Sequence, residues 1–63
     1  MTYFRDRNEA WEHMQQRNRA YARAVNYGAC KDAAVLVDGP DDDYVVMTLN
    51  DAIEGGFLYE WAV

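Results

Sequence analysis

The sequence of 63 residues is long enough for one domain, and it carries six Lys and Arg side chains against eleven Asp and Glu, a net charge of −5. A domain of this size buries only about 60% of the surface that its unfolded chain exposes, so its core must be rich in large side chains. Hydrophobic residues make up 51% of the sequence, which excludes a disordered chain, while one cysteine and no serine leave few groups for nucleophilic catalysis.

The first half of the sequence predicts one long helix over residues 6–27. Apolar positions recur there at helical spacing, on a stripe formed by Phe4, Trp11, Met14, Asn18, Tyr21 and Val25. Asp6 followed by Glu9 is typical of a capping box at the helix start, with Thr2 as an alternative start one turn earlier. Gly28 marks the end, because glycine readily takes the left-handed conformation that closes a helix.

After Gly28 the spacing changes from helical to strand-like. Two short apolar runs predict strands over residues 33–38 and 44–49. Between them lie Asp, Gly and Pro residues, which favour a tight turn. The two strands are therefore expected to form a hairpin.

The last part of the sequence predicts a single helical turn over residues 50–54 and a third strand over residues 57–62. Thr48 or Asn50 is suited to cap the helical turn, and a pair of glycines ends it. The third strand follows from the alternation of large apolar side chains with other residues. The connection between the second and third predicted strands is too short for a parallel crossover, so these two strands are not expected to pair in parallel.

These elements predict an α+β fold in a single domain, residues 1–63. One long N-terminal helix packs on one face of a small three-stranded antiparallel sheet, with a single helical turn before the last strand. The expected centre of this two-layer core consists of Trp11, Met14, Tyr21, Val25, Val35, Val45, Met47 and Phe57.

The sequence predicts no enzyme, no cofactor and no metal site. The thiol and imidazole of Cys30 and His13 are expected about 25 Å apart along the predicted helix, too far for a catalytic pair. The acidic run of residues 38–43 departs from the calcium-loop pattern, because three of its acids are consecutive and its glycine precedes them.

No apolar run has the length of a signal peptide or of a membrane span, which needs about 20 residues. Together with the single cysteine, this favours a soluble protein in the cytoplasm. A terminal strand at a sheet edge permits pairing with a second copy, so we expect a monomer or a weak homodimer.

The net charge divides unevenly along the chain. Residues 1–31 hold six basic and three acidic side chains, a charge of +3, whereas residues 32–63 hold eight acidic side chains and no Lys or Arg, a charge of −8. Such a surface can imitate the phosphates of DNA and bind a basic nucleic-acid channel of a partner protein. The candidate partner-binding residues are Asp38, Asp41, Asp42, Asp43, Asp51, Glu54 and Glu60.

Other interpretations of the charge stay open. The acids also serve simply to keep a small domain soluble. Arg17, Arg19 and Arg23 have no acid three or four residues away, so they fold against the acidic half, form the surface of a small nucleic-acid-binding regulator, or contact an acidic surface of a partner protein. The net charge argues against direct nucleic-acid binding. A third alternative is an assembly module that pairs through its last strand, and surplus aromatic residues such as Tyr3 and Tyr59 also qualify as contacts.

The segment from Thr48 to Trp61 reads TLNDAIEGGFLYEW. In a very short, acidic chain without a catalytic set, it resembles the small phage-encoded inhibitors of bacterial defence, and among these it looks most like the anti-CRISPR proteins, with the type I-C system as the suggested target. The resemblance implies a stoichiometric inhibitor in the host cytoplasm that binds a CRISPR effector complex at its DNA-binding surface and has no enzyme activity.

Overall fold

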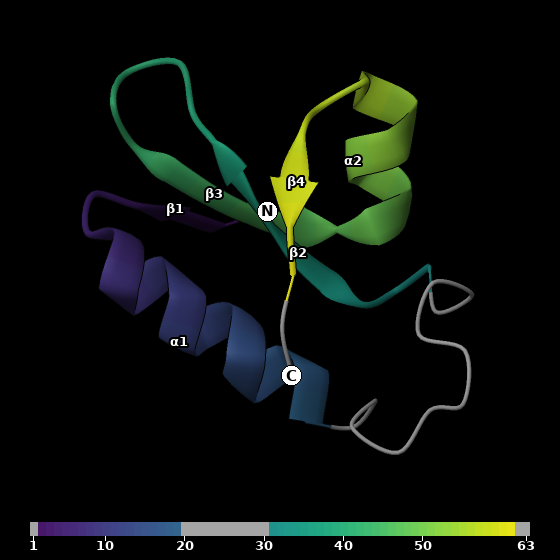
Figure 1. Cartoon of the computed structure of the whole chain (residues 1–63), viewed down its shortest axis with the longest axis horizontal. Helices are drawn as coiled ribbons and strands as arrows, with labels where there is room; N and C mark the ends of the chain where they lie inside the picture. Colours follow the sequence, from purple (N-terminus) through teal and green to yellow (C-terminus); the bar gives the residue numbers. More distant parts are fainter. Residues whose placement is uncertain (1, 20–30, 62–63) are drawn as a thin grey trace.

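Six elements follow one another in the computed structural model, which describes residues 2–19 and 31–61 (Figure 1). In chain order they are β1 (Thr2–Phe4), α1 (Arg7–Asn18), β2 (Ala34–Asp38), β3 (Tyr44–Thr48), α2 (Leu49–Gly55) and β4 (Tyr59–Glu60). All four strands of this described part belong to one antiparallel sheet in the order β1-β3-β2-β4. The α+β class and the antiparallel sheet are therefore confirmed, whereas the expected number of three strands is wrong.

The additional strand is β1, which pairs with β3 in the register Thr2 to Val46, Tyr3 to Val45 and Phe4 to Tyr44. Its three residues are too few to show an alternating pattern. The helical spacing of Phe4 points instead to the long helix. The expectation that Phe4 belongs to the stripe of the helix is wrong, because Phe4 lies on β1 and packs against the apolar cluster beneath α1 from the sheet.

Helix α1 starts where the capping pattern predicts. Asp6 is the N-cap, and its side chain accepts a hydrogen bond from the backbone N–H of Asn8 at 3.1 Å, so the alternative start at Thr2 is wrong. Helix α1 ends at Asn18 with Arg19 as its C-cap, so the prediction of one continuous helix from residue 6 to residue 27 is wrong. The remaining part of the predicted helix, residues 20–27, lies outside the described residues, and with it Tyr21 and Val25 of the predicted core.

The hairpin and the short helix agree with the predicted ranges to within about one residue, since each is set by local signals. Thr48 rather than Asn50 caps α2, because the Thr48 hydroxyl accepts a hydrogen bond from the N–H of Asp51 at 3.2 Å. Gly56 ends α2 with φ 71°, in the left-handed region that glycine favours.

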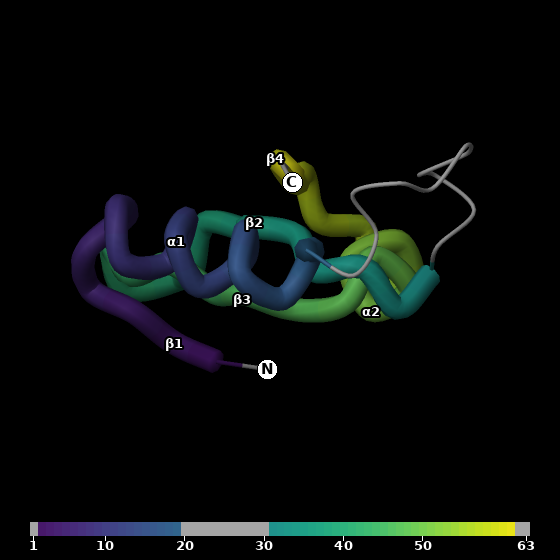
Figure 2. Tube along the Cα trace, turned by 90° about the horizontal axis from the view of Figure 1, so that it is seen from below, coloured from purple at the N-terminus to yellow at the C-terminus, as the bar shows by residue number. Residues whose placement is uncertain are grey.

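The two helices lie on opposite faces of the sheet (Figures 1 and 2). The connection from β1 to β2 and the one from β3 to β4 each skip one strand and advance in the same direction across the sheet. Their starting strands, β1 and β3, run antiparallel. Crossovers of the same hand therefore place α1 and α2 on opposite sides, and the fold consists of two interlocked split β-α-β units.

Apolar side chains are buried on both faces of β2 and β3. Under α1 lie Ala10, Met14, Ala34, Leu36 and Val46, and on the α2 side lie Val35, Val37, Val45, Met47, Leu49 and Ala52. Trp61 packs against both clusters. The predicted core on a single sheet face is therefore wrong, although an almost continuous apolar run is typical of strands covered on both sides.

Four of the predicted core residues are buried, namely Met14, Val35, Val45 and Met47, and Trp11 is partly buried. The prediction that Phe57 lies in the core is wrong, because its side chain is 46% exposed. The predicted strand 57–62 is reduced to Tyr59–Glu60, which pairs with β2 at the sheet edge. The turn at Gly56 leaves Phe57 at the surface, beside the end of α2 rather than beneath it.

Asn18, the buried polar residue at the end of α1, joins that helix to β2. Its Nδ2 donates to the Ala34 carbonyl at 2.8 Å, and its Oδ1 accepts from the Ala34 N–H at 2.7 Å. In an antiparallel ladder, Ala34 and Leu36 direct their backbone groups to the same neighbour, and Leu36 pairs with Glu60 of β4. The Asn18 carboxamide therefore continues that ladder at Ala34.

We expect Asn18→Ala to lower the free energy of unfolding by about 2–3 kcal/mol, because it leaves the buried N–H and carbonyl of Ala34 without their partner. For a chain of this length that is a large part of a total of about 3–9 kcal/mol. Urea unfolding measures the loss. The exposed neighbour Gln16→Ala is the control, and equal stability of the two variants would contradict the anchoring role of Asn18.

Candidate protein-binding surface

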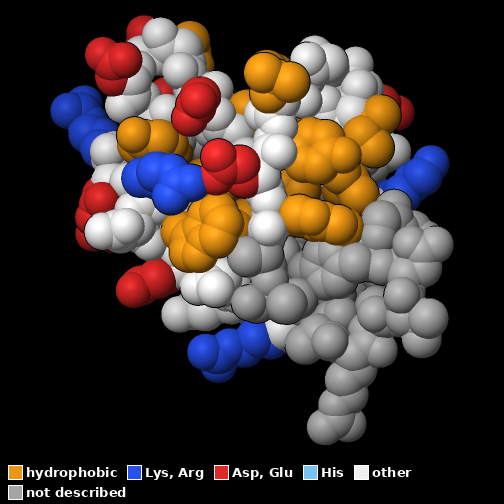
Figure 3. Space-filling view, in the orientation of Figure 1, with side chains coloured by type: hydrophobic (Ala, Val, Ile, Leu, Met, Phe, Trp, Pro, Cys, Tyr) orange, Lys and Arg blue, Asp and Glu red, His pale blue; other side chains and the backbone are white. Residues whose placement is uncertain are grey.

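Four of the seven candidate carboxylates meet at the turn between β2 and β3. Asp38 ends β2, and Asp41, Asp42 and Asp43 follow in the turn. Asp38 lines one depression together with Asp42 and Asp43, and all three consecutive acids line a second one of about 500 Å³. The turn thus brings these acids together at one end of the molecule, where Figure 3 shows them at the upper left.

Two of these acids have a role in shaping the turn itself. Asp42 has φ 57°, in the left-handed region where Asp is one of the better tolerated residues. The N–H of Gly39 donates to the carbonyl of Asp43 at 2.8 Å, which closes the turn. The Asp43 Oδ1 is buried and has no hydrogen-bond partner. It occupies the space beside Gly39, because a Cβ on Gly39 would lie only 1.8 Å from this oxygen. Asp38 and Asp41 are exposed and have no comparable part in the turn.

Asp51 and Glu54 belong to a different part of the surface. Both are exposed on α2, which packs beside the opposite end of β2 and β3 from the turn. Asp51 lies in the first turn of α2, where a carboxylate is favoured by the helix dipole. These two acids and the acidic turn are therefore separated by the length of the β2–β3 hairpin.

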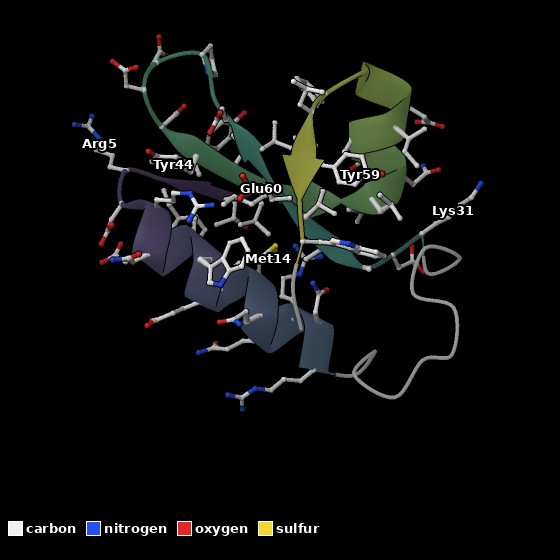
Figure 4. All side chains as sticks on the ribbon, viewed as in Figure 1. Arg5, Met14, Lys31, Tyr44, Tyr59 and Glu60 are labelled. Atoms are coloured by element: carbon white, nitrogen blue, oxygen red, sulfur yellow. The ribbon has the colours of Figure 1, made fainter. Side chains whose placement is uncertain are left out.

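Glu60 is matched by a cation. Its carboxylate forms an ion pair with the guanidinium of Arg7, and that guanidinium lies 5.1 Å from the centre of the Trp11 ring. Figure 4 shows Glu60 between β4 and α1. The pair is the one ion pair within the described residues, and it ties the edge strand to the helix. The sequence does not reveal it, because the two residues are 53 positions apart.

The other basic residues are distributed over the ends of the molecule. Arg5 lines the larger depression beside the acidic turn, and Figure 4 shows it at the same end, with Lys31 at the opposite end. Arg17 and Arg19 are exposed near the end of α1. Arg23 lies outside the described residues. Hence two basic residues of the described part lie near the acidic turn, Arg5 beside the acids of residues 41–43 and Arg7 beside Asp38, and neither forms an ion pair with these acids.

Exposed apolar side chains form a second feature of the surface. The large ones are Tyr3, Ile53, Phe57, Leu58 and Tyr59. Leu58 is 94% exposed and lies just before β4, where Figure 3 shows apolar side chains over β4 and α2. Tyr3 and Phe57 border a groove on the face of the sheet opposite α1. Phe57 was missed as a surface residue because its alternation with Tyr59 and Trp61 resembles that of a core strand.

The described residues hold no group of three or more His, Cys, Asp or Glu side chains that could bind a metal ion. His13 packs its ring against Phe4, with ring centroids 5.1 Å apart, which gives it a structural contact. Cys30 lies outside the described residues. No helix within residues 2–19 and 31–61 is long and apolar enough to cross a membrane.

Comparison with protein families, with curated protein sequences and with solved structures finds no match for this chain. The function proposed for it therefore depends on its own residues.

We expect Gly39→Ala to destabilise the turn by about 1–2 kcal/mol, because the new Cβ would lie 1.8 Å from Oδ1 and 2.8 Å from Cγ of Asp43. Thermal unfolding measures the loss. Adding Asp43→Ala should restore most of the stability, since both clashing atoms lie beyond the Cβ of Asp43. A double variant as unstable as Gly39→Ala alone would show that the backbone of the turn, and not the carboxylate, occupies the space beside Gly39.

Proposed function

We propose that this chain is a non-enzymatic inhibitor that binds a partner protein at a basic, nucleic-acid-binding surface. The observation that carries the proposal is the concentration of Asp38, Asp41, Asp42 and Asp43 in one hairpin turn, none of them in an ion pair within the described part of the chain. The suggested partner is a CRISPR effector complex of type I-C, which the chain would prevent from binding its target DNA in the host cytoplasm.

Electrostatics supports this assignment of the turn. Carboxylates on consecutive residues repel one another, and this repulsion is relieved when they face a cationic surface. Asp38 and Asp41 are exposed and are not needed to form the turn, so their charge is free to act on a partner. A surface of one sign raises the rate of association with a partner of opposite sign, an effect that salt weakens.

The other candidate acids are less suited to the same contact. Glu60 is paired with Arg7, and Asp51 and Glu54 lie on α2, away from the turn. The α2 acids lie at the other end of the β2–β3 hairpin from the turn, so they form a separate group of charges. We therefore centre the DNA-like surface on the turn and treat the α2 acids as a separate element of the test.

In the test, the double variant Asp41→Asn with Asp42→Asn is titrated against a type I-C effector complex, and the binding of target DNA is measured by fluorescence anisotropy. Asn keeps the size of both side chains and tolerates the left-handed backbone of Asp42. We expect about tenfold weaker inhibition in low salt, which corresponds to about 1.4 kcal/mol, and a smaller difference as salt is raised.

Two further double variants remove the same number of charges elsewhere. Asp51→Asn with Glu54→Gln tests α2, and Glu12→Gln with Asp32→Asn is the control at exposed positions outside the candidate set. We expect the control to inhibit as the unaltered chain does. Equal inhibition by the turn variant and the control, in folded proteins, would overturn the role of the turn, whereas weaker inhibition by the α2 variant alone would move the contact to α2.

The alternative of a nucleic-acid-binding regulator is favoured by one observation, the exposure of Arg17 and Arg19 near the end of α1. Because the net charge of −5 opposes a phosphate backbone, we expect no shift of DNA or RNA in a gel assay at physiological salt. A shift that disappears steeply with added salt, and that Arg17→Gln with Arg19→Gln abolishes, would favour the regulator instead.

A further inference from the structure

The face of the sheet opposite α1 carries an open groove of about 470 Å³ between the hairpin turn and α2. Figure 3 shows the surface hollowed between these two parts, at the top of the view. Its apolar lining consists of Tyr3, Val37, Pro40, Val45, Met47 and Phe57. The groove has the size and the lining of a site for one large apolar side chain.

The floor and the rims of the groove differ in exposure. Val37, Val45 and Met47 form a floor that is almost closed to water, at 3%, 4% and 2% exposure, whereas Tyr3 and Phe57 are exposed by 60% and 46%. A side chain entering the groove therefore makes most of its contact with the two aromatic rings. Contacts between aromatic rings contribute beyond the area that they bury.

The backbone at the end of α2 sets the position of the Phe57 ring. A Cβ on Gly55 would lie 2.4 Å from Cε2 and 2.7 Å from Cδ2 of Phe57, so the ring rests directly against this glycine. The N–H of Phe57 donates to the carbonyl of Ala52 at 3.0 Å, which fixes the backbone at the same point. Phe57 is thus a rim residue held in place, and not a side chain on a loose loop.

Carboxylates surround one end of the groove. Asp38 lines it directly, and Tyr3 belongs both to this groove and to the neighbouring depression that holds Asp41, Asp42 and Asp43. An apolar group bound between Tyr3 and Phe57 would therefore have acidic groups beside it. This arrangement favours a ligand that combines an apolar side chain with positive charges.

We propose that the groove binds a large apolar or aromatic side chain from a basic segment of the partner protein. The inference rests on the proposed function and adds to it the chemistry of the contact: positive residues face the acidic turn while the apolar side chain lies between Tyr3 and Phe57. A second copy of this chain is disfavoured as the occupant, because each copy brings a charge of −5 and its own acidic turn.

The test uses capped peptides and the full chain, with no effector complex present. The probe is Lys-Lys-Phe-Lys-Lys, and the charge control is Lys-Lys-Ala-Lys-Lys. Binding is followed by NMR through the methyl groups of Val37, Val45 and Met47, which line the groove. We expect the phenylalanine peptide to bind about tenfold more tightly and to shift these methyl signals, whereas the alanine peptide shifts only signals of the turn.

Variants of this chain locate the contact. Phe57→Ala should abolish the preference for the phenylalanine peptide, and Gly55→Ala should reduce it, because the new Cβ displaces the Phe57 ring without replacing any residue that lines the groove. Gly55 does not have a left-handed φ, so alanine is compatible with its backbone. Leu58→Ala is the matched control, because Leu58 is an exposed apolar neighbour that lies outside the groove, and it should keep the full preference.

Equal affinity for both peptides, or a preference that survives Phe57→Ala in a folded chain, would overturn the groove as the site. A solution mass of two chains that falls to one in Phe57→Ala would assign the groove to a second copy and would also overturn the proposal. These results are distinguishable from failure of the proposed function, since the charge variants of the turn are tested separately by inhibition of the effector complex.

Discussion

The two hydrogen bonds between the Asn18 carboxamide and the backbone of Ala34 are the constraint on which the arrangement of the other elements depends. They attach the end of α1 to β2 at a position that β4 does not reach. Just before Ala34, the carbonyls of Lys31 and Ala33 accept hydrogen bonds from the N–H groups of Asn50 and Leu49 in the first turn of α2, at 3.0 and 2.8 Å. The short segment from Lys31 to Ala34, at the start of β2, therefore holds helices on both faces of the sheet, and it satisfies polar groups that would otherwise be buried unpaired.

Covering both faces of so small a sheet has a consequence for the aromatic residues. The central strands fill both apolar clusters with Val, Leu and Met, and α2 is only seven residues long, so it covers one end of its face. Tyr3 and Phe57 lie over the remaining end and stay partly in water. The exposed aromatic groove thus follows from the short length of α2.

Prediction from the sequence succeeds where a signal is local. The cap at Asp6, the turn after Asp38 and the left-handed stop at Gly56 each depend on a few neighbouring residues, and the boundaries that they set are found nearly as expected. β1 has three residues and is defined by its pairing with β3, which no local pattern shows, whereas β4 is expected from its alternation but is limited to the two residues that pair with β2. The acids of the turn are adjacent in sequence and so lie together, whereas the position of Glu60, which lines a depression with Asp38 and Arg7, depends on the crossover over β2.

The uneven charge of the two halves of the sequence is redistributed by this topology. Because β4 lies at the edge next to β2, Glu60 reaches Arg7 on α1, and one acid of the negative half is neutralised by a cation of the positive half. The turn projects from the end of the hairpin, where Arg5 lines a depression with the acids of residues 41–43 and Arg7 lines one with Asp38, neither in an ion pair with these acids within the described residues. The fold therefore concentrates unmatched negative charge beside an apolar groove. A basic surface alone would contact the first of these features, and a basic surface with a protruding apolar side chain would contact both.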